Sequence, residues 1–233
     1  MANRSNIALA LDNVEELPRL KYLVESTKEF VGVYKVGFEQ FIRFGPEMFD
    51  LIRKEERSIF LDMKLHDIPN TVAKAVASAS QHEVDFLTLH AIGGKPMLES
   101  ASEMASKYKN APKLIAVTIL TSVDQECMNR DMKIAGSVED QVVHLASVAQ
   151  ASGVDGIVCS AADLPTVKPT LIDGFEIITP GIRPAGVDAG DQKRIATPID
   201  AINNGATLLV IGRAITGSDN PRGAAEAILN SIK

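Results

Sequence analysis

Cysteine and histidine are scarce in this 233-residue sequence, and neither has the spacing of a metal site. The two cysteines, Cys127 and Cys159, lack a paired spacing, which argues against a disulfide scaffold and against a cysteine-based zinc site. The four histidines are scattered, with no His-x-x-x-His pair. The sequence therefore predicts no metal site. Cys159 follows Ile157 and Val158 and is expected to be a buried small hydrophobe.

Long apolar runs and an excess of basic residues are also missing. No run approaches the roughly 18 apolar residues of a membrane span, and the N-terminus has no signal-peptide pattern, so we expect a soluble cytoplasmic protein. The net charge of −6 leaves no basic surface for nucleic acid or anionic lipid. An anionic ligand would have to be held by a few placed groups, such as an arginine or a helix N-terminus.

The order of apolar runs predicts a barrel of alternating strands and helices. Short apolar runs alternate with longer amphipathic ones. Eight strand and helix pairs fit a (β/α)₈ TIM barrel that forms a single domain over residues 1–233. A doubly wound sheet is the competing fold, but it needs fewer strands and usually carries a Gly-x-Gly-x-x-Gly fingerprint, which is absent here, as is a Walker loop. Strands are expected at 6–11, 31–36, 58–63, 85–90, 113–118, 155–159, 175–178 and 207–211, and helices at about 14–28, 38–55, 69–82, 94–107, 138–151, 161–168, 198–204 and 221–231.

Charged residues end three successive apolar strands. Asp12 follows the first, Lys35 the second, and Asp62 with Lys64 the third. In parallel α/β folds the C-terminal strand ends gather ligands and catalytic groups. Isolated buried charges are costly, whereas four that converge on one mouth would neutralise one another. We therefore favour a shared functional site over the alternative, a structural salt bridge at one strand end with Asp67 near a helix N-terminus.

Two long segments and the end of the eighth strand suggest where a ligand is held. Residues 121–137 and 179 to about 197 are long for barrel loops, and such loops are often functional. Prolines and glycines in the second segment suggest a lid over the mouth, although a solvated surface loop has a similar composition. Gly212 and Arg213 follow the eighth strand, where barrels often bind phosphate through backbone N–H groups and an arginine.

The run from Asp62 to Thr71 resembles the signature of the orotidine 5′-monophosphate decarboxylase family, and the resemblance covers nearly the whole chain. It implies removal of carbon dioxide from C6 of orotidine monophosphate to give uridine monophosphate, the final step of de novo pyrimidine synthesis. It also implies a homodimer that works without a cofactor. Further motifs follow in the family's order: Ala8–Asp12, Lys35–Gly37, Leu120–Ser122, Thr179–Arg183, Asp191–Gln192 and Ile211–Arg213.

The same resemblance implies a role for each matching residue. Lys64 would protonate C6 as the carboxylate leaves, and Asp62 would lie beside that carboxylate. Lys35 and Asp12 would bind the ribose hydroxyls and hold the charges in place. Asp67 of the partner subunit would join Lys64, Asp62 and Lys35 as a catalytic member of the charge network. The other expected contacts are Ile68 and Thr71 from the partner subunit on the ribose side, Thr121 rather than Ser122 on the pyrimidine, Pro180 on the substrate, and Arg183, Gln192, Gly212 and Arg213 on the phosphate and lid side.

Two other functions remain open from the sequence. A decarboxylase or aldolase of the same barrel group would act on a sugar phosphate and would use a similar Asp-x-Lys-x-x-Asp pattern with magnesium to stabilise an enediolate. A catalytically silent nucleotide-binding protein would bind without turnover, but it would gain nothing from a buried ammonium between two carboxylates. Dependence on metal separates the first from a decarboxylase of orotidine monophosphate, and turnover separates the second.

Overall fold

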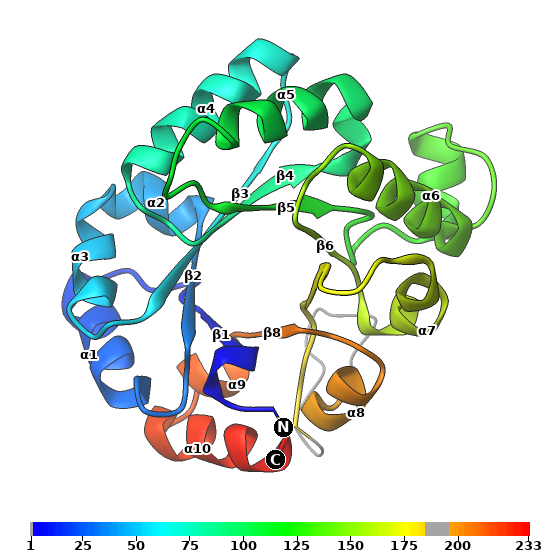
Figure 1. The fold of residues 1–233 in the computed structure, drawn as a ribbon. Coiled ribbons are helices and arrows are strands. Elements are labelled where there is room, and N and C mark those ends of the chain that lie inside the picture. Colours follow the sequence, from blue (N-terminus) through cyan, green and yellow to red (C-terminus); the bar gives the residue numbers. More distant parts are fainter. Residues whose placement is uncertain (1, 185–195) are drawn as a thin grey trace.

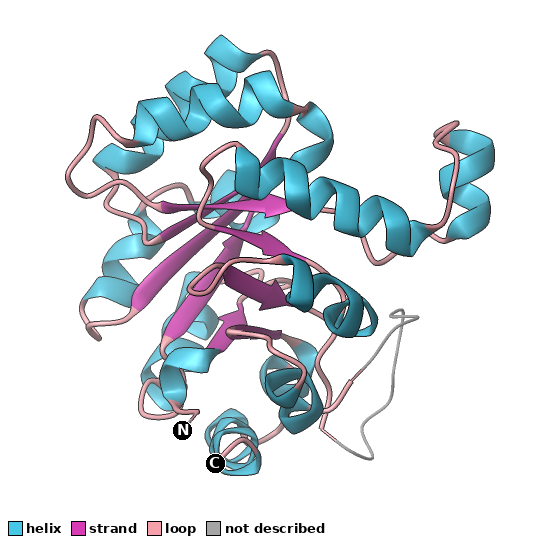
Figure 2. Ribbon diagram, turned by 45° about the vertical axis from the view of Figure 1, so that its right-hand side comes forward, coloured by secondary structure: helices cyan, strands magenta, loops and turns pink. Residues whose placement is uncertain are grey.

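Eight parallel strands close into a barrel, and helices surround it (Figures 1 and 2). The computed structural model describes residues 2–184 and 196–233. Each strand pairs with the next one along the chain, and β8 returns to pair with β1, which confirms the predicted TIM barrel. The strands are β1 (Ile7–Ala10), β2 (Val33–Gly37), β3 (Ser58–Leu65), β4 (Phe86–His90), β5 (Lys113–Val117), β6 (Gly156–Val158), β7 (Glu176–Thr179) and β8 (Leu208–Ile211).

The helices follow the strands along the chain, and several have a proline in the first turn. Prolines 69, 96, 198 and 221 lie in the first turns of α4, α5, α8 and α10, where a missing N–H costs nothing. None of the helices in the described ranges is both long enough and apolar enough to span a membrane. The helices are α1 (Leu17–Thr27), α2 (Phe38–Phe44), α3 (Glu47–Arg53), α4 (Pro69–Gln81), α5 (Lys95–Ala105), α6 (Val138–Ala151), α7 (Leu164–Val167), α8 (Pro198–Asn203), α9 (Arg213–Thr216) and α10 (Pro221–Ser231).

The prediction of a single helix over residues 38–55 is wrong, because the structure has two helices there, α2 and α3. Gly45 lies between them with φ of +62°, a left-handed conformation that ends a helix, and Pro46 then starts the next one. The helix expected over 161–168 is also interrupted, since α7 lies between two short 3₁₀ turns. In the long loop 121–137 the structure adds a π-helical turn at Cys127–Asp131.

Alternation along the strands separates two apolar layers and positions the polar groups. Residues such as Ile7 and Leu9 pack outward against the helices, whereas Ala8 and Ala10 face the barrel interior with Phe60. Lys35 and Asp62 lie two residues beyond the inward-facing Val33 and Phe60, so they continue the interior face toward the C-terminal strand ends. The barrel is therefore apolar inside and charged at one mouth.

Candidate active site

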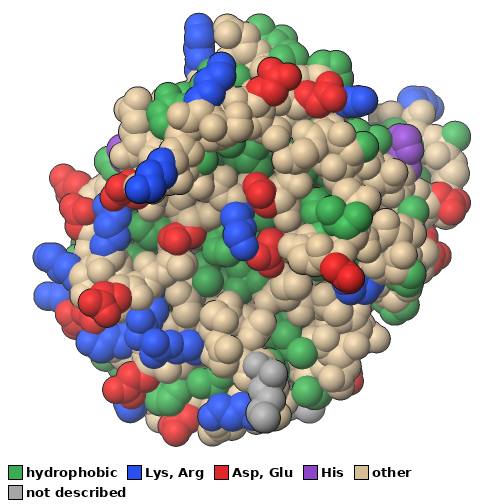
Figure 3. Space-filling model, in the orientation of Figure 1, with side chains coloured by type: hydrophobic (Ala, Val, Ile, Leu, Met, Phe, Trp, Pro, Cys, Tyr) green, Lys and Arg blue, Asp and Glu red, His purple; other side chains and the backbone are tan. Residues whose placement is uncertain are grey.

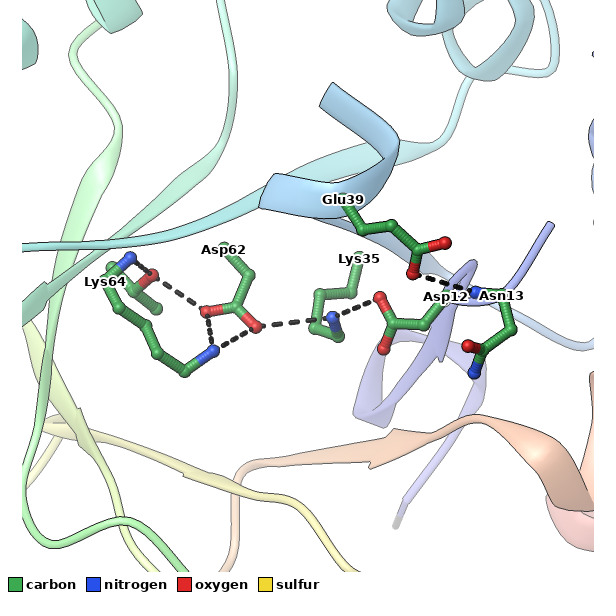
Figure 4. A network of polar contacts seen from close by, with 7 residues as sticks. Asp12, Asn13, Lys35, Glu39, Asp62 and Lys64 are labelled. Atoms are coloured by element: carbon green, nitrogen blue, oxygen red, sulfur yellow. Dashed lines mark hydrogen bonds and ion pairs between the residues drawn. The ribbon is translucent and has the colours of Figure 1, made fainter. Parts of the chain in front are cut away.

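Four charged side chains form an alternating chain of acid and base at this mouth (Figure 4). Lys35 Nζ lies 3.0 Å from Asp12 Oδ1 and 3.3 Å from Asp62 Oδ2. Lys64 Nζ donates hydrogen bonds to both carboxylate oxygens of Asp62, each at 2.8 Å. Asp12 follows β1, Lys35 lies in β2, and Asp62 and Lys64 lie in β3, so the convergence expected from the strand ends is present.

The two central members of this chain hold their charges despite deep burial. Lys35 and Asp62 are each only 7% exposed. Burial alone would lower the pKa of Lys35, but the carboxylates of Asp62 and Asp12 outweigh it, so this pKa is raised. Burial would likewise raise the pKa of Asp62, but the ammonium groups of Lys35 and Lys64 outweigh it, and the pKa is lowered. The site therefore keeps paired ionic groups in a dry environment.

Lys64 occupies an unusual backbone conformation. Its φ is +48°, which is rare for a side chain of this size. The pairing of β3 with β4 shifts register here, from Leu61 opposite Leu87 to Leu65 opposite Leu89. Such a bulge redirects side chains and is common beside functional sites. In this chain it accompanies an ammonium turned back onto the carboxylate two residues earlier.

Thr88 is a member of the site that the sequence analysis missed. Its side chain is fully buried, and Oγ1 donates to Asp62 Oδ1 at 2.9 Å while accepting the Lys64 N–H at 2.8 Å. Thr88 is the one polar residue in the apolar run 86–89. An inward-facing polar residue in a barrel strand is the signal that could have identified it.

A pocket of about 520 Å³ opens beside the charges. Figure 3 shows acidic and basic side chains meeting in the hollow at the middle of this face, next to apolar ones. The apolar wall includes Phe60, Val158, Ile178 and Val210. Of the predicted site residues, those that line the pocket are Asp12, Lys35, Asp62, Lys64, Thr121, Pro180, Arg183, Gly212 and Arg213.

The pocket is also lined by residues expected around a phosphate. Arg183 is buried, whereas Arg213 is exposed at the start of α9. A Cβ on Gly212 would meet Ala10 Cβ at an ordinary 3.5 Å, so packing within the protein does not explain a glycine here. Thr121 lines the pocket and its neighbour Ser122 does not. Gln192 and the centre of the predicted lid lie outside the described residues.

Three predicted site residues do not reach the pocket of their own chain. Asp67, Ile68 and Thr71 are exposed at the start of α4, and Ile68 is 65% exposed. Asp67 Oδ1 accepts the N–H of Ile68 at 2.6 Å.

Cys159 is buried, as predicted, and burial raises the pKa of its thiol, which keeps it neutral.

The side chains that could bind a metal ion are not grouped around the pocket in the described residues. Among residues 2–184 and 196–233, no group of three or more His, Cys, Asp or Glu side chains is placed to hold a metal ion. Within the charged chain each carboxylate instead faces an ammonium. Fold and site together define a (β/α)₈-barrel enzyme whose working groups lie at the C-terminal strand ends.

Comparison with known proteins narrows this class. The model of the orotidine 5′-phosphate decarboxylase / HUMPS family matches residues 5–228. An orotidine 5′-phosphate decarboxylase from Moorella thermoacetica is 41% identical over 100% of this chain and 94% of its own, and one from Shewanella sediminis is 43% identical over 99% and 98%. The crystal structure of orotidine 5′-phosphate decarboxylase from Lactobacillus acidophilus superposes with a TM-score of 0.84 at 31% identity, covering 99% of this chain and 100% of that one. The chain belongs to the orotidine 5′-phosphate decarboxylase / HUMPS family.

Proposed function

We propose that this protein decarboxylates orotidine 5′-monophosphate to uridine 5′-monophosphate, as a cytoplasmic enzyme of de novo pyrimidine synthesis. The observation that carries the proposal is the Lys64 ammonium, held at 2.8 Å from both oxygens of Asp62 beside a pocket of about 520 Å³. Kinship with full-length orotidine 5′-phosphate decarboxylases supports the choice of substrate.

The reaction requires a positive charge at a developing carbanion. The bond between C6 and the carboxylate breaks, carbon dioxide leaves, and the electron pair stays on C6, where the pyrimidine ring delocalises it poorly. An ammonium aimed at C6 stabilises this charge without an electron-sink cofactor and then gives C6 its proton. Lys64 fills this role, because Asp62 and the rest of the charged chain keep a cation stable in the pocket. The catalytic contribution is stabilisation of the transition state.

The remaining pocket residues bind the rest of the nucleotide. Lys35 and Asp12 bind the ribose hydroxyls and hold the chain of charges in register. Thr121, after β5, contacts the pyrimidine, and Pro180, after β7, lies along the substrate. The phosphate contacts come from Arg183, Gln192, Gly212 and Arg213, of which Gln192 lies outside the described residues.

The phosphate lies far from the reacting carbon, and binding there assists the chemistry. Arg213 follows β8 and Lys64 lies in β3, three strands away around the closed barrel, and both residues line the pocket. Energy from a remote, non-reacting group can close a loop and dry the site in which charge develops. Phosphate binding thereby raises the rate and not only the affinity.

A direct assay tests the reaction and its main alternative. Purified protein in excess EDTA should consume orotidine monophosphate, followed by its absorbance, because Lys64 supplies the positive charge. Lys64→Ala should lower kcat by many orders of magnitude, since charge stabilisation and proton delivery are both lost. Activity that disappears on chelation and returns with magnesium would instead assign the protein to the sugar-phosphate enzymes. Binding of the nucleotide without turnover would leave a silent binding protein.

We further propose that the active unit is a homodimer in which each site takes Asp67, Ile68 and Thr71 from the partner subunit. The support is their exposure at the start of α4, outside the pocket of their own chain. Asp67 also lies only three residues after Lys64, in a segment that can reach across a two-fold interface.

Mixing two inactive variants tests the shared site. Lys64→Ala and Asp67→Ala homodimers should both be almost inactive, because each lesion damages both sites. In a mixed dimer one site carries both lesions and the other none. Random exchange makes about half the dimers mixed, so about a quarter of wild-type activity should return. No recovery, with exchange verified by mass spectrometry, would mean that Asp67 serves its own chain.

A further inference from the structure

Thr88 occupies a unique place opposite the bulge in β3. Leu61 pairs with Leu87 and Leu65 with Leu89, so residues 62–64 of β3 stand against Thr88 alone in β4. Both Asp62 and Lys64 belong to this three-residue segment. A bulge disrupts the regular ladder of backbone hydrogen bonds between strands. Thr88 is therefore the β4 residue that faces both charged groups.

The Thr88 hydroxyl uses its donor and an acceptor at once. It accepts the Lys64 N–H at 2.8 Å and donates to Asp62 Oδ1 at 2.9 Å. The first bond supplies a partner for a backbone N–H next to the register shift, where an unmade bond is costly. The second fixes one oxygen of the carboxylate that also binds Lys64 Nζ. One buried side chain thus joins the backbone of Lys64 to the counter-ion of its ammonium.

The backbone of Lys64 needs such a restraint. Its φ of +48° is strained for a residue that carries a side chain, and such conformations persist only where the surroundings enforce them. A relaxed backbone would redirect the whole lysine side chain. Displacement of a reacting group by about 1 Å can lower a rate by about a hundredfold.

We propose that Thr88 is a positioning residue, whose hydroxyl holds the Lys64 backbone and the Asp62 carboxylate so that the ammonium points into the pocket. It acts through these two residues. The catalytic part of this inference rests on the proposed decarboxylation, whereas the structural part does not.

Three variants separate positioning from a general loss of packing. Thr88→Val removes the hydroxyl at nearly constant volume, and Thr88→Ser keeps it. Thr118→Val is the matched control: Thr118 is buried beyond β5, and its Oγ1 donates to the Val158 carbonyl at 2.8 Å, away from the charged chain. Thr88→Val should lower kcat by about tenfold to a hundredfold, with a smaller change in KM. Thr88→Ser should recover most of kcat, and Thr118→Val should keep it.

A pH profile and hydrogen exchange complete the test. Thr88→Val removes a donor to the ionised form of Asp62, so the acid limb of kcat/KM should move to higher pH. Amide exchange of Lys64 should accelerate in Thr88→Val, but stay slow in Thr88→Ser and Thr118→Val. A wild-type kcat in Thr88→Val, or equal losses of kcat in Thr88→Val and Thr118→Val, would overturn the catalytic inference. Unchanged Lys64 exchange would overturn the positioning itself, even if the wild-type protein proved inactive toward orotidine monophosphate.

Discussion

Replacement of Lys35 by methionine tests whether the central ammonium stabilises the fold through its carboxylate partners. Methionine keeps most of the apolar stem and removes the charge. Lys35 Nζ lies 3.3 Å from Asp62 Oδ2, and both residues are buried. At an effective dielectric constant of about 20, two such charges attract by about 5 kcal/mol before the cost of desolvation is subtracted.

The net loss of stability should be smaller than this attraction. Breaking a buried ion pair costs about 3–5 kcal/mol when it leaves an uncompensated charge. Here Asp62 keeps Lys64 at 2.8 Å and Thr88 at 2.9 Å, and the Asp12 side chain is 42% exposed and regains water. We therefore expect Lys35→Met to lower the free energy of unfolding by about 1–3 kcal/mol.

Urea denaturation at a fixed protein concentration measures this difference, and a double-mutant cycle isolates its cause. Lys35→Met/Asp62→Asn should lose less stability than Lys35→Met alone, because no buried carboxylate is then left short of a partner. Lys21→Met is a control: its pair with Glu25 is half exposed, so it should cost under about 1 kcal/mol. A double variant no more stable than Lys35→Met would refute the reasoning.

Three further perturbations probe other parts of the site. Gly37→Ala would place a Cβ 2.8 Å from Asp12 Oδ1, so KM in steady-state assays should rise more than kcat falls; an unchanged KM would show that Asp12 does not bind substrate. Arg213→Ala should raise KM strongly and lower kcat less, and a near-wild-type kcat/KM would contradict the phosphate assignment. Burial lowers the pKa of His90 below 6.5, and the neighbouring His66 and Lys64 add to this effect. Folding therefore favours the neutral form of the His90 imidazole. The stability that the neutral His90 contributes is present above pH 6.5 and is lost as pH falls through the folded-state pKa. His90→Gln should therefore reduce the difference in the free energy of unfolding between about pH 7.5 and about pH 5.5, measured by urea titration. An unchanged pH dependence would exclude His90 as the source of the loss.

Local signals misplaced some element boundaries. The amphipathic pattern runs through residues 38–55, although Gly45 and Pro46 mark the break that the structure shows. A helical period continues across such a break because α2 and α3 both turn apolar side chains toward the barrel. β3 also extends to Leu65, two residues beyond its predicted end, so Lys64 lies within the strand.

The sequence by itself determined the barrel and the meeting of Asp12, Lys35, Asp62 and Lys64. Strand and helix periods are local properties, and the C-terminal ends of parallel strands in a closed barrel necessarily share one mouth. For this reason a charge at the end of each of three apolar strands was enough to predict a common site.

Only the tertiary structure decided how these charges are held. The left-handed backbone of Lys64 and the two bonds of Thr88 arise from the register shift between β3 and β4. That shift depends on how two strands, separated along the chain by α4, pack side by side in a closed sheet. No local pattern encodes it, because the partner of the Lys64 N–H lies 24 residues away and is fixed by pairing between strands.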